Sequence, residues 1–293
     1  MEITYTIEEN NKTIKQILKE RLFISDRLLT FLKKNSLILY NNDKITNLNI
    51  LARLNSTVTV DLNFEEDNNN IVPIKMDLKI IYEDEALLII DKPAGIPVHP
   101  SILHYTNSLS NGVKYYFDSI NLKKKIRPVN RLDRNTSGIV IFAKNQYIQE
   151  CLIHQMQTKE FKKTYLAVVE GHFKKLNGTI DAPITRKENS IIERCVAENG
   201  EKSITHYKVL KQNFEKNYDI VECLLETGRT HQIRVHLSYI GHPLIGDTLY
   251  GNNSKYISRQ ALHAYKVEFI HPITNKLMQF TSDIPKDFVS FTI

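Results

Sequence analysis

A basic loop that is followed by an apolar strand is the feature that most constrains the fold of this chain. The loop is Arg127-Pro-Val-Asn-Arg-Leu-Asp-Arg-Asn-Thr-Ser-Gly138, and the apolar run Ile139–Ala143 follows it directly. A short continuous apolar run bounded by turn residues predicts a buried strand. The loop contains Asp133, the one acid among six basic residues between positions 121 and 134. Because cations favour the ionised form of a carboxylate, Asp133 is either part of a salt-bridged turn or an anion kept for chemistry on a polyanion.

The rest of the second part of the chain predicts a sheet with interspersed helices. Further β-rich runs are Lys79–Ile81, Leu87–Asp91, Tyr165–Val169, Tyr207–Leu210 and Ile220–Leu225. Residues 230–240 predict a helix, with Thr230 as its N-cap and Gly241 as its C-terminal stop. Because strands and helices do not alternate regularly, the sequence predicts an α+β domain built on a mainly antiparallel mixed sheet.

The first part predicts two short helices and then two strands. The helices carry apolar residues at helical spacing, namely Ile14, Ile17 and Leu18, then Leu28, Leu29 and Leu32. We expect Ser25 to cap the second helix and Asn35 to end it in a left-handed conformation. Strands are predicted at 36–40 and 57–62, with a turn at 41–43.

Residues 12–60 carry nine basic and three acidic side chains. Together with the helix-helix-strand-strand order, this resembles the S4 RNA-binding domain, although Asn35 stands where that family usually has glycine. The alternative is a small capping subdomain that does not contact RNA. The polar segment Asp67–Asn70 is the most linker-like part of the chain. We therefore expect a small domain at residues 1–70 and a larger one at residues 71–293.

The charge distribution indicates a polyanionic partner. The net charge is +6, and basic residues concentrate in two zones, around 12–60 and around Asp133. No apolar run reaches the roughly eighteen residues of a membrane span, and the amino terminus lacks a signal-peptide pattern. Three cysteines without metal-type spacing predict free thiols in a reducing compartment. We expect a cytoplasmic monomer without an obligate protein partner.

Six motifs occur in order along the second part of the chain. They are Tyr82–Gly95, Val98–Pro100, Asn130–Gly138, Lys163–Gly171, Thr227–His236 and Gly241–Asp247, the last followed by Tyr250-Gly251. Together they resemble the RluA/RluD family of RNA pseudouridine synthases, from about Lys79 to Pro272. Any one of them is weak support, whereas six in order form a specific match. One departure is Asn130, where the family usually has histidine; both side chains can hydrogen-bond.

The resemblance implies an isomerase that converts uridine to pseudouridine in structured RNA, most often large-subunit ribosomal RNA or tRNA. The reaction breaks the C1′–N1 bond, turns the uracil and joins C5 to C1′, so it requires no cofactor or metal. Asp133 matches the family's catalytic aspartate, which either attacks a carbon or removes a proton. Arg234 matches the arginine that pairs with this aspartate, and Tyr165 matches the tyrosine that stacks on the target base.

The resemblance also suggests that Arg131 fills the space left when the target uridine is flipped out. Other basic residues are expected to contact RNA, namely Arg127, Arg134, Lys123, Lys124 and Lys125 near the loop and Arg27 in the first domain. His231 and His236 lie five residues apart on a predicted helix and point in different directions, so no metal site is expected. Asp247 and the segment Lys92–Gly95 are predicted to form structural turns.

Two other functions compete with this prediction. One is a non-catalytic RNA-binding protein with a decayed synthase domain, against which the presence of Asp133, Tyr165 and Arg234 argues. The other is a nucleosidase or glycosidase, which also uses carboxylates at an anomeric carbon. Such enzymes usually need a second acid, and none accompanies Asp133 in its motif.

Overall fold

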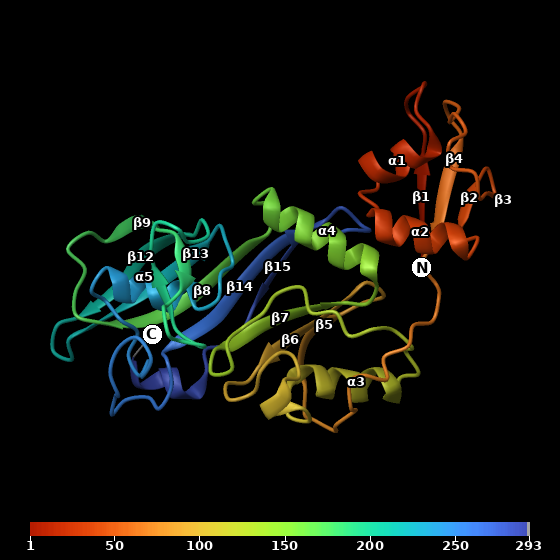
Figure 1. The fold of residues 1–293 in the computed structure, drawn as a ribbon. Coiled ribbons are helices and arrows are strands. Elements are labelled where there is room, and N and C mark those ends of the chain that lie inside the picture. Colours follow the sequence, from red (N-terminus) through yellow and green to blue (C-terminus); the bar gives the residue numbers. More distant parts are fainter. Residues whose placement is uncertain (292–293) are drawn as a thin grey trace.

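The structure is a computed structural model that describes residues 1–291 (Figure 1). Its helices are α1 Ile14–Glu20, α2 Asp26–Lys34, α3 Leu109–Ser119, α4 Gln146–Gln157 and α5 Gln232–Tyr239, with 3-10 turns at Ile102–His104 and Lys286–Phe291. Its strands are β1 Glu2–Thr6, β2 Ile38–Tyr40, β3 Asp43–Lys44, β4 Thr57–Asp61, β5 Lys79–Glu83, β6 Leu87–Lys92, β7 Ser137–Ala143, β8 Lys162–Glu170, β9 Asn177–Asp181, β10 Ile184–Arg186, β11 Arg194–Val196, β12 Ile204–Asn213, β13 Tyr218–Leu225, β14 Leu262–Ile270 and β15 Leu277–Thr281. Within residues 1–291, no helix is both long and apolar enough to cross a membrane.

The small N-terminal unit is a four-stranded antiparallel sheet in the order β1-β4-β2-β3, packed on α1 and α2. The apolar residues predicted at helical spacing are buried in both helices. Ser25 caps α2 as predicted, because its hydroxyl accepts a hydrogen bond from the amide of Leu28 at 3.2 Å. The helix-helix-strand-strand prediction missed β1, which pairs along its whole length with β4.

The large sheet has nine strands, in the order β5-β6-β7-β14-β8-β13-β12-β9 with β15 beside β14. Its neighbours are antiparallel except for β7 and β14, so the predicted α+β class with a mainly antiparallel mixed sheet is confirmed. Successive side chains alternate between faces: Leu87 and Ile89 of β6 pack toward α4, whereas Leu88 and Ile90 pack toward α3. Figure 1 shows these helices on opposite sides of the sheet. Burial on both faces explains why β6 and β7 are continuously apolar.

The parallel contact between β7 and β14 requires a glycine. Gly138 has φ +110, and a Cβ there would lie 2.2 Å from the carbonyl oxygen of Ala264. Any larger residue would separate the two strands just after the loop that carries Asp133. A glycine at position 138 is therefore required for β7 to pair with β14 and for the Asp133 loop to lie next to this pairing.

Residues 62–78 connect the two sheets and lie against the larger one. The ammonium group of Lys124 donates to the carbonyl oxygens of Leu62 and Phe64 at 2.9 and 2.5 Å. The Ser25 hydroxyl donates to Glu150 of α4 at 2.6 Å, and one apolar cluster continues from α1 and α2 to β6 and β7. The N-terminal unit is therefore packed on the large sheet rather than freely tethered, as Figure 1 shows beside α4.

The ends of two helices differ from the prediction. Asn35 has φ −98°, and the left-handed residue is its neighbour Ser36, with φ 54°. The helix α5 starts at Gln232 with His231, not Thr230, as its N-cap. Gly241 follows α5 with φ +85°, as predicted for a helix stop. The pattern analysis also missed α3 and α4, whose apolar residues are interrupted by Asn, Gly and Gln and so give a weak helical period.

Candidate active site

The loop that carries Asp133 is fixed by one of its own side chains and by side chains from two other parts of the chain. Asn130 is buried and bonds to the backbone of β7, donating to the carbonyl of Ile139 and accepting from the amide of Ile141, both at 2.9 Å. Arg259 donates to the carbonyl of Asn135 at 3.0 Å and to the hydroxyl of Ser137 at 3.2 Å. In this chain, asparagine therefore orders the loop at the position where the family usually has histidine.

Lys92, at the end of β6, also supports this loop. Its ammonium group is fully buried and donates to the carbonyls of Pro93, Ile96 and Arg134 at 2.9, 2.9 and 3.1 Å. Burial, with a contribution from the charge of Arg259, lowers the pKa of Lys92 to about 7. The predicted Lys92–Gly95 turn also supports the basic loop through its backbone, since the amide of Gly95 donates to the carbonyl of Arg134 at 2.9 Å.

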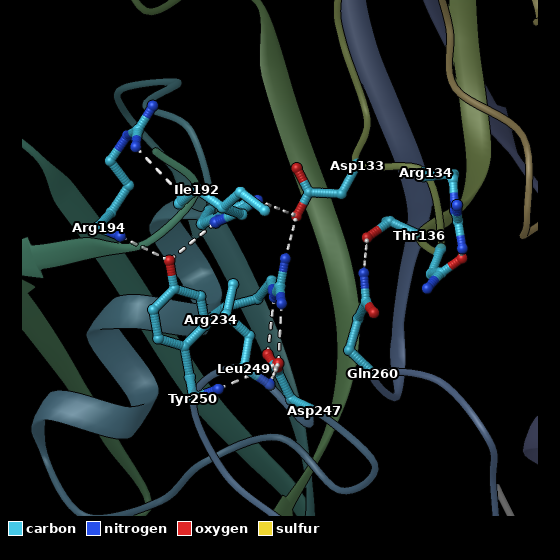
Figure 2. A network of polar contacts seen from close by, with 12 residues as sticks. Asp133, Arg134, Thr136, Ile192, Arg194, Arg234, Asp247, Leu249, Tyr250 and Gln260 are labelled. Atoms are coloured by element: carbon cyan, nitrogen blue, oxygen red, sulfur yellow. Dashed lines mark hydrogen bonds and ion pairs between the residues drawn. The ribbon is translucent and has the colours of Figure 1, made fainter. Parts of the chain in front are cut away.

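The carboxylate of Asp133 lies at the end of a chain of charged groups (Figure 2). Arg234, on the buried face of α5, donates from Nη1 to Oδ2 of Asp133 at 3.0 Å. The same guanidinium binds Asp247 through two bonds, Nε to Oδ2 at 2.7 Å and Nη2 to Oδ1 at 2.8 Å. Burial lowers the pKa of Arg234, but the two carboxylates outweigh this effect and its pKa is raised. Within residues 1–291, no hydrogen bond to Oδ1 of Asp133 is found, so this oxygen is available to a substrate.

Asp247 is almost completely buried and also accepts bonds from the amides of Leu249 and Tyr250, at 3.1 and 3.3 Å. It forms the predicted turn, and through its two bonds to Arg234 it also sets the direction of the guanidinium. The sequence analysis missed this second role. The only signal for this role in the sequence was the acid of the Gly246-Asp247 motif. The sequence does not show its partner, because Arg234 lies thirteen residues away on another element.

Tyr250 holds a second group beside Asp133. Its hydroxyl oxygen accepts a hydrogen bond from the backbone amide of Arg194 at 2.8 Å. The hydroxyl proton is therefore free to be donated to Nδ1 of His231, also at 2.8 Å. This arrangement favours a neutral His231 that carries its proton on Nε2, which lies 3.8 Å from Oδ2 of Asp133. Burial lowers the pKa of His231 and so favours the same neutral ring. The ring of Tyr250 also lies 5.0 Å from the guanidinium carbon of Arg234.

A cleft of about 720 Å³ opens beside Asp133, and Arg131 and Tyr165 line it. Tyr165 projects from β8 and is 7% exposed. Burial and the charge of Asp133 raise its pKa, so the phenol keeps its proton. A smaller recess next to the cleft includes Arg234 and His231. The structure therefore brings together four of the predicted site residues, namely Asp133, Tyr165, Arg234 and Arg131.

The other predicted RNA-binding residues lie elsewhere. Arg127 forms two hydrogen bonds with Glu66 of the connecting segment, and both side chains are 11% exposed. Lys123 pairs with Glu65 at 3.1 Å, and Lys124 is bound by the carbonyls described above. Lys125 and Arg134 are exposed, the latter 3.5 Å from His104, and Arg27 is exposed on α2. Two of these cations, Arg127 and Lys124, are thus already engaged inside the protein.

His231 and His236 have separate partners. His236 is buried against the hydroxyl of Thr205 and the carbonyl of Ala182, both at 2.9 Å. In the described part of the chain, no group of three or more metal-ligating side chains is found.

Comparison with known proteins identifies the family. The model of the RNA pseudouridylate synthase family matches residues 86–239. A Bacillus subtilis relative, the uncharacterized RNA pseudouridine synthase YhcT, is 38% identical over 98% of this chain and 94% of its own length. The ribosomal large subunit pseudouridine synthase D of Zymomonas mobilis is 37% identical, over 78% of this chain and 76% of its own length.

A solved structure supports the same assignment. The human RNA pseudouridylate synthase domain containing 1 aligns with a TM-score of 0.59 and 27% identity, over 71% of this chain and 84% of that one. The matched family region contains Asp133, Tyr165 and Arg234, and the structure places all three around the smaller recess next to the cleft. The chain belongs to the RNA pseudouridylate synthase family.

Proposed function

We propose that this enzyme forms pseudouridine in large-subunit ribosomal RNA, with Asp133 as the catalytic carboxylate. The observation that carries the proposal is the chain from Asp247 through Arg234 to Asp133, which ends in an unbonded carboxylate oxygen at the cleft. The relatives named ribosomal large subunit pseudouridine synthase D, which are 35–39% identical, support ribosomal RNA as the substrate.

The geometry suits a reaction at the anomeric carbon. Arg234 occupies Oδ2 of Asp133, so the free Oδ1 is the atom that attacks the sugar carbon or removes the 2′ hydrogen. Both routes break the C1′–N1 bond and release a uracil anion. After the uracil turns, C5 bonds to C1′, and Asp133 either leaves the sugar carbon that it attacked or returns its proton to C2′. The C5 proton then leaves and N1 gains a proton, so no atoms are gained or lost. Tyr165 offers a ring face on which the uracil can stack while it turns, because stacking demands no fixed hydrogen-bond direction.

Arg131 lines the same cleft and is exposed, so we propose that its side chain fills the space that the flipped uridine leaves in the RNA. We propose that residues 1–70 form an S4-like RNA-binding domain and residues 71–293 the catalytic domain, with Arg27 of α2, Lys125 and Arg134 as phosphate contacts. Lys123, Lys124 and Arg127 would contact RNA only after their bonds to residues 62–66 are released. The protein acts as a cytoplasmic monomer in this proposal, in accordance with its free cysteines.

Sequencing of carbodiimide-treated ribosomal RNA tests the substrate. RNA from cells with the gene, without it, and with a gene carrying Asp133→Asn should be compared. We expect one or a few large-subunit positions to lose their pseudouridine signal in the last two strains. An unchanged large-subunit signal together with lost positions in tRNA would refute ribosomal RNA as the substrate.

A further inference from the structure

Most charged groups in the active-site cleft are paired with other groups of the protein. Asp133 is bound by Arg234, and Glu226 accepts from Lys159 and from His206, at 2.6 and 2.7 Å. Arg229 pairs with Glu201. Lys202 and Arg131 also line the cleft, but both are exposed and therefore well hydrated.

Lys163 differs from these residues. It projects from β8 into the cleft and is partly buried. Within residues 1–291, its ammonium group forms no hydrogen bond and no ion pair. Burial lowers the pKa of Lys163, and no neighbouring carboxylate opposes that effect. A Cβ added at Gly228 would lie 3.3 Å from the ammonium nitrogen, so the turn around Gly228 closes over this group.

The position of Lys163 relates it to the target nucleotide. Side chains two residues apart on a strand point to the same face, so Lys163 lies on the same face of β8 as Tyr165. Lys162 points to the opposite face and pairs there with Glu268 at 2.7 Å. A nucleotide whose base lies on Tyr165 would therefore have its own or the neighbouring backbone next to Lys163.

A partly buried cation without a counter-charge is unfavourable for folding. A chain that places one in its active-site cleft needs a ligand that supplies the negative charge. In an RNA substrate that charge is the phosphodiester, which binds lysine as a point charge.

We propose that Lys163 binds a backbone phosphate of the RNA strand next to the flipped uridine, and that this phosphate supplies the counter-charge missing from the cleft. The inference rests on the proposed function, because it requires an RNA strand in this cleft. It assigns a phosphate site to a residue that the fold leaves without a structural partner.

The test compares Lys163→Met with Lys162→Met and Lys163→Arg, each in an Asp133→Asn background that prevents turnover. Binding of a labelled RNA hairpin with uridines in its loop is measured at several potassium chloride concentrations, and thermal stability is measured without RNA. We expect Lys163→Met to weaken binding roughly tenfold and to reduce the slope of log affinity against log salt by about 0.7 to 0.9. The melting temperature should stay the same or rise, since an uncompensated cation is removed. Lys162→Met should leave binding and slope unchanged, and Lys163→Arg should retain most of both.

The same substitutions in the active enzyme supply a second readout. Lys163→Met should raise the RNA concentration needed for half-maximal rate and leave the single-turnover rate at saturating RNA nearly unchanged. An unchanged salt slope, or a fall in melting temperature parallel to the loss of affinity, would overturn the phosphate assignment. A lower saturating rate with an unchanged slope would also overturn it and indicate a contact with the base. Failure of the wild-type enzyme to modify ribosomal RNA would refute the proposed substrate but not the salt slope, which is measured on the hairpin.

Discussion

The two halves of the basic run between positions 123 and 134 look alike in the sequence and differ in the structure. In the first half, Arg127 is bound by Glu66, and Lys124 by the carbonyls of Leu62 and Phe64. In the second half, Arg131 lines the cleft, and Arg134 is exposed 3.5 Å from His104. The first half holds the connecting segment against the large sheet, and the second half flanks Asp133 in the chain and leaves its two arginines exposed.

The two halves differ because folding brings different charged partners to them. Glu66 reaches Arg127 because the connecting segment runs along the large sheet, while Arg234 reaches Asp133 from α5, 101 positions later in the chain. Both ion pairs are largely buried, yet one holds two parts of the fold together and the other leaves a carboxylate oxygen free. The identity of a charged residue therefore says less about its role than the partner that folding brings to it.

The largest effect is expected from removing the charge at the cleft. Asp133→Asn keeps the shape of the side chain and removes the anion, so the rate of pseudouridine formation should fall by about 10³-fold or more. RNA affinity should change little, because the cations around the cleft remain. Single-turnover assays and filter binding measure the two quantities, and a rate that falls by less than about 100-fold would contradict the assignment of Asp133.

A smaller loss of rate is expected when Arg234 loses its ion pair with Asp247. Asp247→Asn removes the charge that directs the guanidinium of Arg234, and a displacement of about 1 Å at the reacting group lowers the rate up to about 100-fold. Breaking this buried pair should also lower the free energy of unfolding by about 3 kcal/mol. A variant that is less stable but has the wild-type rate at a temperature where it is folded would show that Asp247 is structural only.

The first half of the basic run should respond in stability and not in rate. Glu66→Gln leaves Arg127 largely buried without its anion, so the free energy of unfolding should fall by about 1 to 3 kcal/mol. The rate at saturating RNA should stay within a factor of about two, since the cleft is unchanged. Glu65→Gln is the matched control, because its pair with Lys123 is exposed and worth at most about 1 kcal/mol. A strong loss of rate in Glu66→Gln would contradict this separation and show that the first half of the basic run also contributes to catalysis.

The last effect, small for each single pH unit, concerns Lys92, which holds the second half of the basic run through the carbonyl of Arg134. Its folded pKa of about 7 lies below the ordinary 10.5, so between these values the unfolded chain binds a proton that the folded protein does not. The free energy of unfolding should therefore rise with pH in this window, by at most about 1.4 kcal/mol per pH unit. Lys92→Met should lose this slope in denaturant titrations from pH 7 to 10. An identical slope in both proteins would mean that the three carbonyls keep Lys92 charged throughout.

Local pattern and motif order were sufficient for much of this protein. The apolar run after Gly138 predicted β7, and the lack of strand–helix alternation predicted the antiparallel sheet, because burial of a strand follows from its own residues. The order of six motifs identified the family and pointed to Asp133, Tyr165 and Arg234. Those three residues lie in motifs of fixed order and spacing, so their types and positions mark them in the sequence.

Only the tertiary structure decided what the other charged residues do. Lys163 and Lys162 are neighbours of the same type, and the strand sends one to the cleft and the other to Glu268. Asp247 resembled a turn residue until folding placed both its oxygens on Arg234. The physical reason is that an electrostatic interaction depends on distance and burial, and both are set by segments far apart in the chain. The sequence by itself therefore determined the fold class, the family and the carboxylate that we propose as catalytic, and the packing of distant segments decided which cations serve the fold and which face the cleft.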